Sequence, residues 1–379
     1  MNVYLDGMFF RLSGIGRCYE NLLQALLASD DVGRVSTVVP ESREREFRAM
    51  FDHEKLDARF VDFPNLSPSD ILLKGRVIAK FVPRPDLFHF PNINVPFFLR
   101  GTIISSINDV IPLSEHSDFS GIEKAGFRFL AKRALRVSSR VVCISESCRD
   151  QVAEKLGVQK TGISVIYPWL GEEFPERVEA ARRGPRVVEG DYILFVGNRY
   201  LHKNLKVLME ALRLLSQDFP GLKAAVVGTR MRPMDDVDVA DSDPLLRGRV
   251  LQFPQASDDA VASLYANARA FVFPTLMEGF GIPPLEAMAT GIPVVCSDIP
   301  VVREVCGNAV RYADPSDAGS FAGRIRAALT EPEWNEVYRK RGAERVRRYT
   351  REESIRRYLD LFRECLEAGR KSSPRRDGA

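Results

Sequence analysis

The sequence has little of what marks metalloproteins, membrane proteins and secreted proteins. It has only four histidines, and its six cysteines are scattered with no CxxC pair, so we expect no zinc site. No run of 18 apolar residues is present, which argues against a transmembrane helix. Residues 1–6 lack a basic start and an apolar signal core. Together these absences favour a cytosolic protein.

An excess of charge of one sign is also missing. The net charge is +3 over 379 residues, which is too weak to indicate a nucleic-acid partner. The composition, 45% apolar and 28% charged, is typical of a globular protein. The length allows two domains of about 150–200 residues each.

Short apolar runs alternate with amphipathic helical patterns along the whole chain. This alternation predicts repeated βα units and parallel sheets with helices on both faces. The polar stretch 171–190 divides the units into two sets. We therefore expect an α/β protein with two doubly wound Rossmann-like domains that face each other across a cleft, where ligands bind beyond the carboxyl ends of the strands. The expected strands are 2–6, 35–40, 58–62, 86–89, 101–108, 140–145, 162–167, 192–197, 222–228, 250–253, 270–274, 292–297 and 309–313.

The most informative stretch runs from Glu278 to Glu286, two carboxylates separated by seven residues. The apolar run 271–274 before it predicts a buried strand, and 283–291 after it predicts a helix that begins with proline and ends with glycine. The glycines between them would expose backbone N–H groups at a helix N-terminus, which favours an anion. We expect Glu286 in the first turn of that helix. A pocket of this kind suits a nucleotide-sugar.

The E-x7-E element, the following residues 287–295 and Asp298 resemble the donor site of family 4 retaining glycosyltransferases. The resemblance extends from Gly14 to about Tyr358 and implies the GT-B fold. It implies an acceptor-binding domain at 1–170, a donor-binding domain at 171–354, and a C-terminal helix at about 355–370 that packs back onto the first domain. The donor-binding residues that it implies are Gly14, Gly16, Arg199, Lys203, Glu278, Gly279, Phe280, Gly281, Ile282 and Glu286.

Two further segments have side chains or glycines suited to phosphate. Arg199 and Lys203 follow a predicted strand, and the resemblance implies that they hold the donor diphosphate. Gly14 and Gly16 are expected in a loop before the first helix, close to the donor, although an ordinary βα turn is an alternative. A dinucleotide site is disfavoured because the third glycine of that pattern is replaced by Tyr19.

Asp109 ends a strand of the first domain, after Asn108, where family members commonly have histidine. Asn108 cannot titrate near neutral pH, so a role for it is open. Asp109 is a candidate catalytic residue, with the capping of a turn as the alternative. The acidic pairs in 236–243 resemble a DxD metal motif, but we interpret them as a solvated loop and expect no metal and no other cofactor.

The resemblance implies sugar transfer with retention, in which the catalytic residues are Glu278, Arg199, Lys203 and Asp109. Glu278 would bind the donor sugar, Glu286 the ribose, and the two cations the leaving phosphate. The sequence is similar to bacterial mannosyltransferases of surface-polysaccharide synthesis. The expected donor is therefore GDP-mannose and the expected acceptor a glycan or a lipid-linked glycan. UDP- or dTDP-sugars are alternative donors. Other readings are a UDP-sugar 2-epimerase and a non-catalytic nucleotide-sugar-binding protein.

Two basic amphipathic segments, 71–84 and 119–140, bear on the location of the protein. Such segments can lie on anionic lipid, which would place a cytoplasmic protein at the inner face of the membrane. Alternatively, each is a helix packed on a sheet with a charged outer face.

Overall fold

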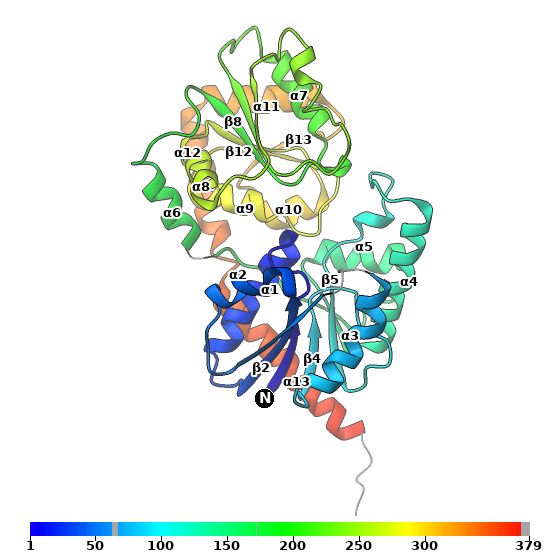
Figure 1. The fold of residues 1–379 in the computed structure, drawn as a ribbon. Helices are drawn as coiled ribbons and strands as arrows, with labels where there is room; N and C mark the ends of the chain where they lie inside the picture. The colour runs from blue at the N-terminus through cyan, green and yellow to red at the C-terminus, as the bar shows by residue number, and fades with distance from the viewer. Residues whose placement is uncertain (63–66, 172, 373–379) are drawn as a thin grey trace, which may run out of the picture. The chain divides into compact units, whose positions relative to one another are not determined.

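The structure, a computed structural model, describes residues 1–62, 67–171 and 173–372. Its contacts divide the chain into two compact units, each built on its own sheet (Figure 1). The first unit comprises Met1–Val110, Gly121–Pro168 and the segment from Arg351 onward. The second unit comprises Ile111–Ser120 and Trp169–Thr350.

The first unit contains a sheet of seven strands, all parallel, in the order β3-β2-β1-β4-β5-β6-β7. The strands are β1 (Asn2–Asp6), β2 (Arg34–Pro40), β3 (Leu56–Val61), β4 (Leu87–Phe90), β5 (Thr102–Ile107), β6 (Arg140–Cys143) and β7 (Ile163–Val165). The helices are α1 (Ser13–Ala28), α2 (Glu44–Met50), α3 (Pro68–Phe81), α4 (Gly121–Val137), α5 (Glu146–Leu156) and α13 (Arg351–Ser372).

The second unit contains a sheet of six parallel strands in the order β10-β9-β8-β11-β12-β13. The strands are β8 (Tyr192–Val196), β9 (Lys223–Val227), β10 (Val250–Phe253), β11 (Ala270–Phe273), β12 (Val294–Ser297) and β13 (Arg311–Ala313). The helices are α6 (Glu173–Ala181), α7 (Leu205–Leu214), α8 (Asp258–Asn267), α9 (Ile282–Thr290), α10 (Pro300–Cys306), α11 (Ala318–Thr330) and α12 (Pro332–Val346).

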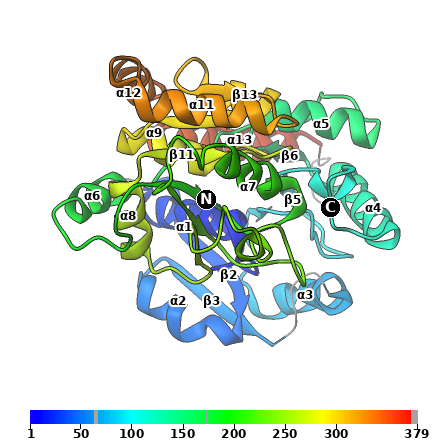
Figure 2. The same cartoon turned by 90° about the horizontal axis from the view of Figure 1, so that it is seen from above.

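Most strands are apolar because helices cover both faces of each sheet (Figures 1 and 2), while the edge strand β3 is only partly buried. All four residues of β11 are buried, as are all four of β12. In the second unit α7 packs beside α11 and α8 beside α9. The predicted fold class, two doubly wound parallel sheets, is confirmed.

Strand order reverses once in each sheet, and this reversal determines where a ligand can bind. In the first unit the switch point lies between β1 and β4, and in the second it lies between β8 and β11. Loops that leave neighbouring strands at a switch point diverge to opposite faces and leave a crevice at the carboxyl edge of the sheet.

The last helix, α13, packs on the first unit. Its Tyr358 and Phe362 lie against the ring of His89 in β4, with ring centroids 5.4 and 5.6 Å away. Ser354 donates a hydrogen bond of 2.7 Å to the carbonyl of Tyr167. The burial of His89 lowers the pKa of its imidazole to about 3, so this histidine is a neutral core residue.

Candidate active site

Lys203 and Glu278 meet at the switch point of the second sheet. Lys203 follows β8 and Glu278 follows β11, and these two strands are neighbours. The Lys203 Nζ lies 2.5 Å from the Glu278 Oε1. The two side chains are only 13% and 11% exposed, so the ion pair is mostly withdrawn from solvent.

Backbone and side-chain hydrogen bonds join the loop after β8 to the loop after β11. Asn204 takes the left-handed conformation (φ 55°), which is tolerated by asparagine, and donates hydrogen bonds to the carbonyls of Pro274 and Pro315. The carbonyl of His202 accepts from the Leu276 N–H at 2.7 Å and from the Thr275 hydroxyl at 3.0 Å. These contacts fix Lys203 opposite Glu278.

The turn after Glu278 leads directly into α9. Gly281 has φ 111°, a conformation that side chains rarely adopt, so glycine is needed there. Phe280 is buried and packs edge-on against Tyr349 at 5.2 Å. Only the backbone of Phe280 is therefore suited to contact a ligand. Pro283 and Pro284 have no N–H, so the first turn of α9 offers fewer donors to an anion than an ordinary helix.

Glu286 lies in the second turn of α9, because the helix begins at Ile282; its predicted place in the first turn was wrong. The residue is only 3% exposed. The Tyr265 hydroxyl donates a hydrogen bond of 2.9 Å to the Glu286 Oε2 and fixes the orientation of the carboxylate. Tyr265 is itself held between Phe271, on which it stacks, and the edge of Phe174.

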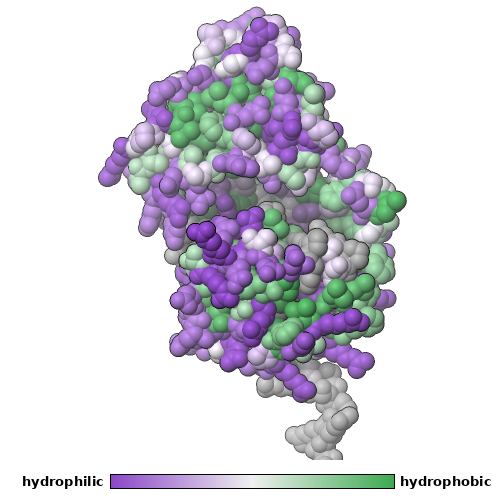
Figure 3. Space-filling model, viewed as in Figure 1, coloured by the Kyte–Doolittle hydropathy of each residue, from purple (hydrophilic) through white to green (hydrophobic). Residues whose placement is uncertain are grey.

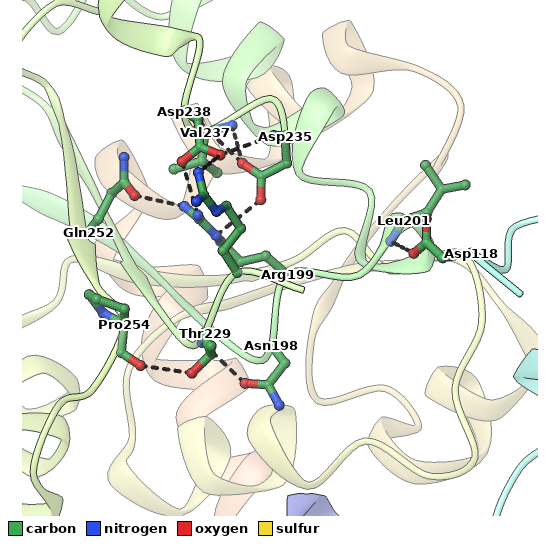
Figure 4. A network of polar contacts seen from close by, with 11 residues as sticks. Asp118, Asn198, Arg199, Leu201, Thr229, Asp235, Val237, Asp238, Gln252 and Pro254 are labelled. Carbon is green, nitrogen blue, oxygen red and sulfur yellow. Dashed lines mark hydrogen bonds and ion pairs between the residues drawn. The ribbon is translucent and has the colours of Figure 1, made fainter. Parts of the chain in front are cut away.

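Arg199 faces acids of its own unit (Figure 4). Its Nε lies 3.0 Å from Asp235, its Nη2 3.0 Å from Asp238, and its Nη1 donates to Gln252 at 2.8 Å. The side chain is 5% exposed. All three nitrogens are thus engaged, and the guanidinium holds the 235–238 loop onto the loop after β8.

The acidic segment 236–243 is less solvated than the sequence predicts. Asp238 is 17% exposed and also pairs with Arg230, while Asp243 pairs with Arg213 at 3.1 Å. Asp241 accepts a hydrogen bond from the N–H of Gly248. Within residues 1–62, 67–171 and 173–372, no group of three or more histidines, cysteines or acids is arranged to hold a metal ion.

Gly14 and Gly16 lie within the first turns of α1, which begins at Ser13, so the predicted loop before the helix was wrong. A Cβ at Gly16 would lie 2.3 Å from the carbonyl oxygen of Phe9, whereas a Cβ at Gly14 would meet nothing within 4 Å. Gly16 is therefore needed for a close backbone approach, and Gly14 is not.

Asn108 and Asp109 follow β5 in the first unit and are both partly buried. The Asn108 side chain donates a hydrogen bond of 2.9 Å to the carbonyl of Pro91. Asparagine thus serves here as a backbone tether. Asp109 lies at the carboxyl end of the sheet, the edge at which doubly wound sheets bind ligands.

A buried ion cluster at the switch point of the first sheet was missed by sequence reasoning. The Lys74 Nζ lies 3.2 Å from Asp6, at the end of β1, and 2.8 Å from Asp70. Asn92 and Asn94 complete the network through hydrogen bonds to Asp6 and Asp70. The four-residue spacing of Asp70 and Lys74 was the available signal, because residues at that spacing meet on a helix face.

Comparison with known proteins assigns both halves of the chain. Residues 12–174 match the model for Glycosyltransferase Family 4, and residues 178–345 match the model for Glycosyl transferases group 1. The chain is 31% identical over 378 residues to O-antigen chain mannosyltransferase B of Escherichia coli, covering 93% of this chain and 97% of the relative. It is 30% identical over 252 residues to O-antigen chain mannosyltransferase RfbU of Salmonella typhimurium, covering 66% of this chain and 67% of the relative.

Solved structures share the fold at low sequence identity. Sucrose-phosphate synthase from Thermosynechococcus elongatus has a TM-score of 0.75 at 17% identity, over 97% of this chain and 100% of that chain. WaaG, a glycosyltransferase involved in lipopolysaccharide biosynthesis, has a TM-score of 0.72 at 16% identity, over 96% of this chain and 99% of that chain. With the two parallel sheets and the relatives above, these matches show that the chain is a glycosyltransferase of the GT-B fold and belongs to family 4.

Proposed function

We propose that this chain transfers mannose from GDP-mannose, with retention at the anomeric carbon and without a metal, to a glycan or lipid-linked acceptor in polysaccharide or lipopolysaccharide synthesis. The observation that carries the proposal is the Lys203–Glu278 pair at the β8/β11 switch point. The names of the two O-antigen mannosyltransferase relatives support mannose as the sugar.

The pair combines the two charges that a nucleotide-sugar needs. The ammonium of Lys203 is suited to the donor phosphate, where negative charge grows as the glycosidic bond breaks. The carboxylate of Glu278 accepts hydrogen bonds from sugar hydroxyls, beside the backbone of residues 279–282. Glu286, oriented by Tyr265, is assigned to the ribose hydroxyls. With both glutamates assigned to substrate hydroxyls, neither is available as a nucleophile for a covalent intermediate. Attack by the acceptor on the front face of the sugar, assisted by the leaving phosphate, fits this assignment.

Arg199 is assigned to positioning rather than to direct phosphate contact. To reach a phosphate, its guanidinium would have to leave two carboxylates and a buried site. Asp109 is proposed to act on the acceptor side, since it belongs to the other unit.

The donor is tested by nucleotide protection against thermal unfolding. A nucleotide at about 100 times its Kd adds about 2.7 kcal/mol of stability, so GDP is expected to raise Tm while UDP and dTDP at the same concentration do not. Lys203→Met should abolish the GDP shift, and Lys206→Met, three residues away and 68% exposed, should keep it. A shift with UDP alone would replace GDP-mannose as the donor.

Product analysis then distinguishes sugar transfer from the two alternative functions, epimerisation and binding without catalysis. With GDP-mannose and an acceptor glycan, a mannosylated product and free GDP are expected in equal amounts. Conversion of a UDP-sugar without an acceptor would instead identify an epimerase. Binding of a nucleotide-sugar with no turnover for any acceptor would leave a binding protein.

A cytoplasmic location is part of the proposal. All six cysteines are free thiols, as is usual in a reducing compartment. None of the helices in the described part of the chain combines the length and apolarity needed to cross a bilayer.

A further inference from the structure

The first unit carries a face that is at once apolar and basic. Figure 3 shows hydrophobic residues gathered over the part of the first unit where α3 lies. We define the docking face as the exposed side chains of α3, the 97–98 turn and α4. Its apolar members are Leu72 (49% exposed), Leu73 (42%), Phe81 (47%), Phe98 (91%), Ile122 (87%) and Phe129 (57%).

On α3 the exposed side holds cations and no acid. Leu72, Leu73, Arg76 and Lys80 recur at helical spacing and are all exposed. The single acid of the helix, Asp70, is fully buried against Lys74. The exposed side chains described on this helix are therefore apolar or positively charged.

On α4 the same combination recurs. Ile122 and Phe129 lie two turns apart on one side, and Lys132 and Arg136 continue that side toward the end of the helix. Glu123 is the one acid within α4, against several lysines and arginines. The two helices thus present the same chemistry.

The turn between them is held by buried polar contacts from both helices. Arg133 of α4 donates to the carbonyls of Val95 and Pro96 at 2.6 and 2.8 Å. From α3, Asp70 accepts from Asn94, and the carbonyl of Ile71 accepts from the N–H of Phe97. The turn is therefore fixed by both helices and lies between them in the fold.

The backbone conformation of Phe98 is not explained by packing of its side chain. Its φ is 66°, a left-handed value that is costly for a bulky residue, and its ring is 91% exposed. Strain of this kind is kept where the surroundings enforce it and often marks function. Here the Arg133 and Asp70–Asn94 contacts hold the residues just before Phe98, whose aromatic ring lies in solvent.

We propose that the docking face binds the surface of an anionic lipid bilayer, with Phe98 and the leucines of α3 inserted among the acyl chains and the cations on the headgroups. The observations favour lipid over a protein partner because cations flank the exposed apolar groups on both helices, and Glu123 is the one exposed acid within α3 and α4. That is the pattern of a helix lying in a membrane interface. Each basic residue near an anionic surface adds attraction that falls off within a Debye length.

The test is flotation of the full-length chain with vesicles. Binding is expected to vesicles of phosphatidylcholine with phosphatidylglycerol, weakly to phosphatidylcholine alone, and to decrease as salt is raised. Phe98→Asn should reduce partitioning at least about tenfold, since an aromatic ring no longer inserts. Arg76→Gln with Lys80→Gln should reduce it roughly 25-fold, about fivefold per cation.

Matched controls lie on α12 of the second unit. Trp334→Asn (55% exposed) and Lys340→Gln (70% exposed) should leave vesicle binding unchanged. Phe98→Asn should also keep or raise Tm, because asparagine tolerates positive φ. Protection by GDP should be the same in all variants. If the unmodified chain shows no GDP protection, the proposed function fails while the vesicle test of this face still stands.

Several results would overturn the proposal. These are equal binding to both vesicle types, no binding to either, or equal losses in the α12 variants. A dimer in solution that Phe98→Asn dissociates, without vesicle binding, would show that the face serves a second copy of the chain.

Discussion

Lys203 and Glu278 are the residues on which the proposed chemistry depends most. Both side chains are mostly withdrawn from water, so their mutual attraction is stronger than that of a surface pair. A donor diphosphate would compete with Glu278 for the Lys203 ammonium. Sugar hydroxyls would compete with Lys203 for the carboxylate. Each partner thus keeps the other in place until substrate arrives.

Replacing Lys203 by alanine is expected to lower kcat/KM by roughly 10²–10³-fold, because one charged partner of the leaving phosphate is lost, about 2–4 kcal/mol. Steady-state kinetics with GDP-mannose measures this. Lys206→Ala is the matched control, since Lys206 is 68% exposed on the outer side of α7, and it should be near wild type. Equal kinetics for the two variants would exclude Lys203 from the site.

Replacing Arg199 by alanine is expected to destabilise the second unit by about 3–5 kcal/mol, because Asp235 is left buried without its cation. Burial already raises the pKa of the Asp235 carboxyl. Thermal or urea unfolding measures the loss. The control Arg230→Ala removes a 49% exposed partner of Asp238 and should cost less than about 1 kcal/mol. A large rise in the Kd of GDP with unchanged stability would show direct phosphate contact.

Sequence reasoning finds residue types more readily than side-chain directions. Glu278 and Glu286 were singled out by their spacing and Lys203 by the family resemblance, and the structure brings Lys203 and Glu278 together. Arg199 looks equally suited to phosphate in the sequence, but its acids lie 36 and 39 positions further on, and only the fold brings them near. Lys74 also looks like a surface cation in the sequence, because its second acid, Asp6, lies 68 positions away and only the fold brings it near.

At the scale of elements, Gly14 and Gly16 have different surroundings in α1, although they look equivalent in the sequence. Gly16 lies where the helix crosses the 7–12 loop, and Gly14 lies where the helix faces open space. The loop prediction failed because two glycines near a helix start lower helix propensity, while the packing of the apolar face of α1 decides the outcome.

Gly16→Ala is expected to destabilise the first unit by about 1–3 kcal/mol, since its Cβ would lie within 2.3 Å of a carbonyl oxygen. Gly14→Ala should stabilise by up to about 1 kcal/mol, because alanine is the better helix former. Unfolding curves of the two variants measure the difference. If Gly14→Ala nevertheless lost donor affinity, Gly14 would have the donor contact that the family resemblance implies.

At the scale of the whole molecule, buried histidines make stability depend on pH. Burial lowers the pKa of His202 to about 4 from an ordinary value of 6.5. In the unfolded chain His202 therefore binds a proton below about pH 6.5, whereas in the folded chain it binds one only below about pH 4. Stability is complete above pH 6.5 and is lost as the pH falls through that window. His89 acts in the same direction.

The expected loss from His202 is about 3 kcal/mol between pH 6.5 and pH 4, at 1.36 kcal/mol per pKa unit. Urea unfolding at a series of pH values measures it. His202→Gln should flatten the curve across this window, while His53→Gln, on the exposed surface, should not. A wild-type curve that is flat from pH 6.5 to 4 would contradict the assignment.

The overall architecture could be predicted because it depends on a repeated signal. Each apolar run between helical patterns became a strand, and such alternation leaves a doubly wound sheet as the natural arrangement. The ion networks around Arg199 and Lys74 could not be predicted in full. Their members lie on separate elements, and no local sequence pattern shows which charges become neighbours in the fold.

The Asp6–Lys74–Asp70 cluster has a consequence for the number of nucleotides that one chain binds. Both sheets have a reversal of strand order, the usual place for a nucleotide in such sheets, but the first unit fills its own with a salt bridge between residues that are fully buried. A chain with two Rossmann-like sheets should consequently take up a single equivalent of GDP in a calorimetric titration. The two sheets are alike in topology, but a buried ion cluster occupies the switch point of the first sheet, so nucleotide binding is proposed for the second sheet alone.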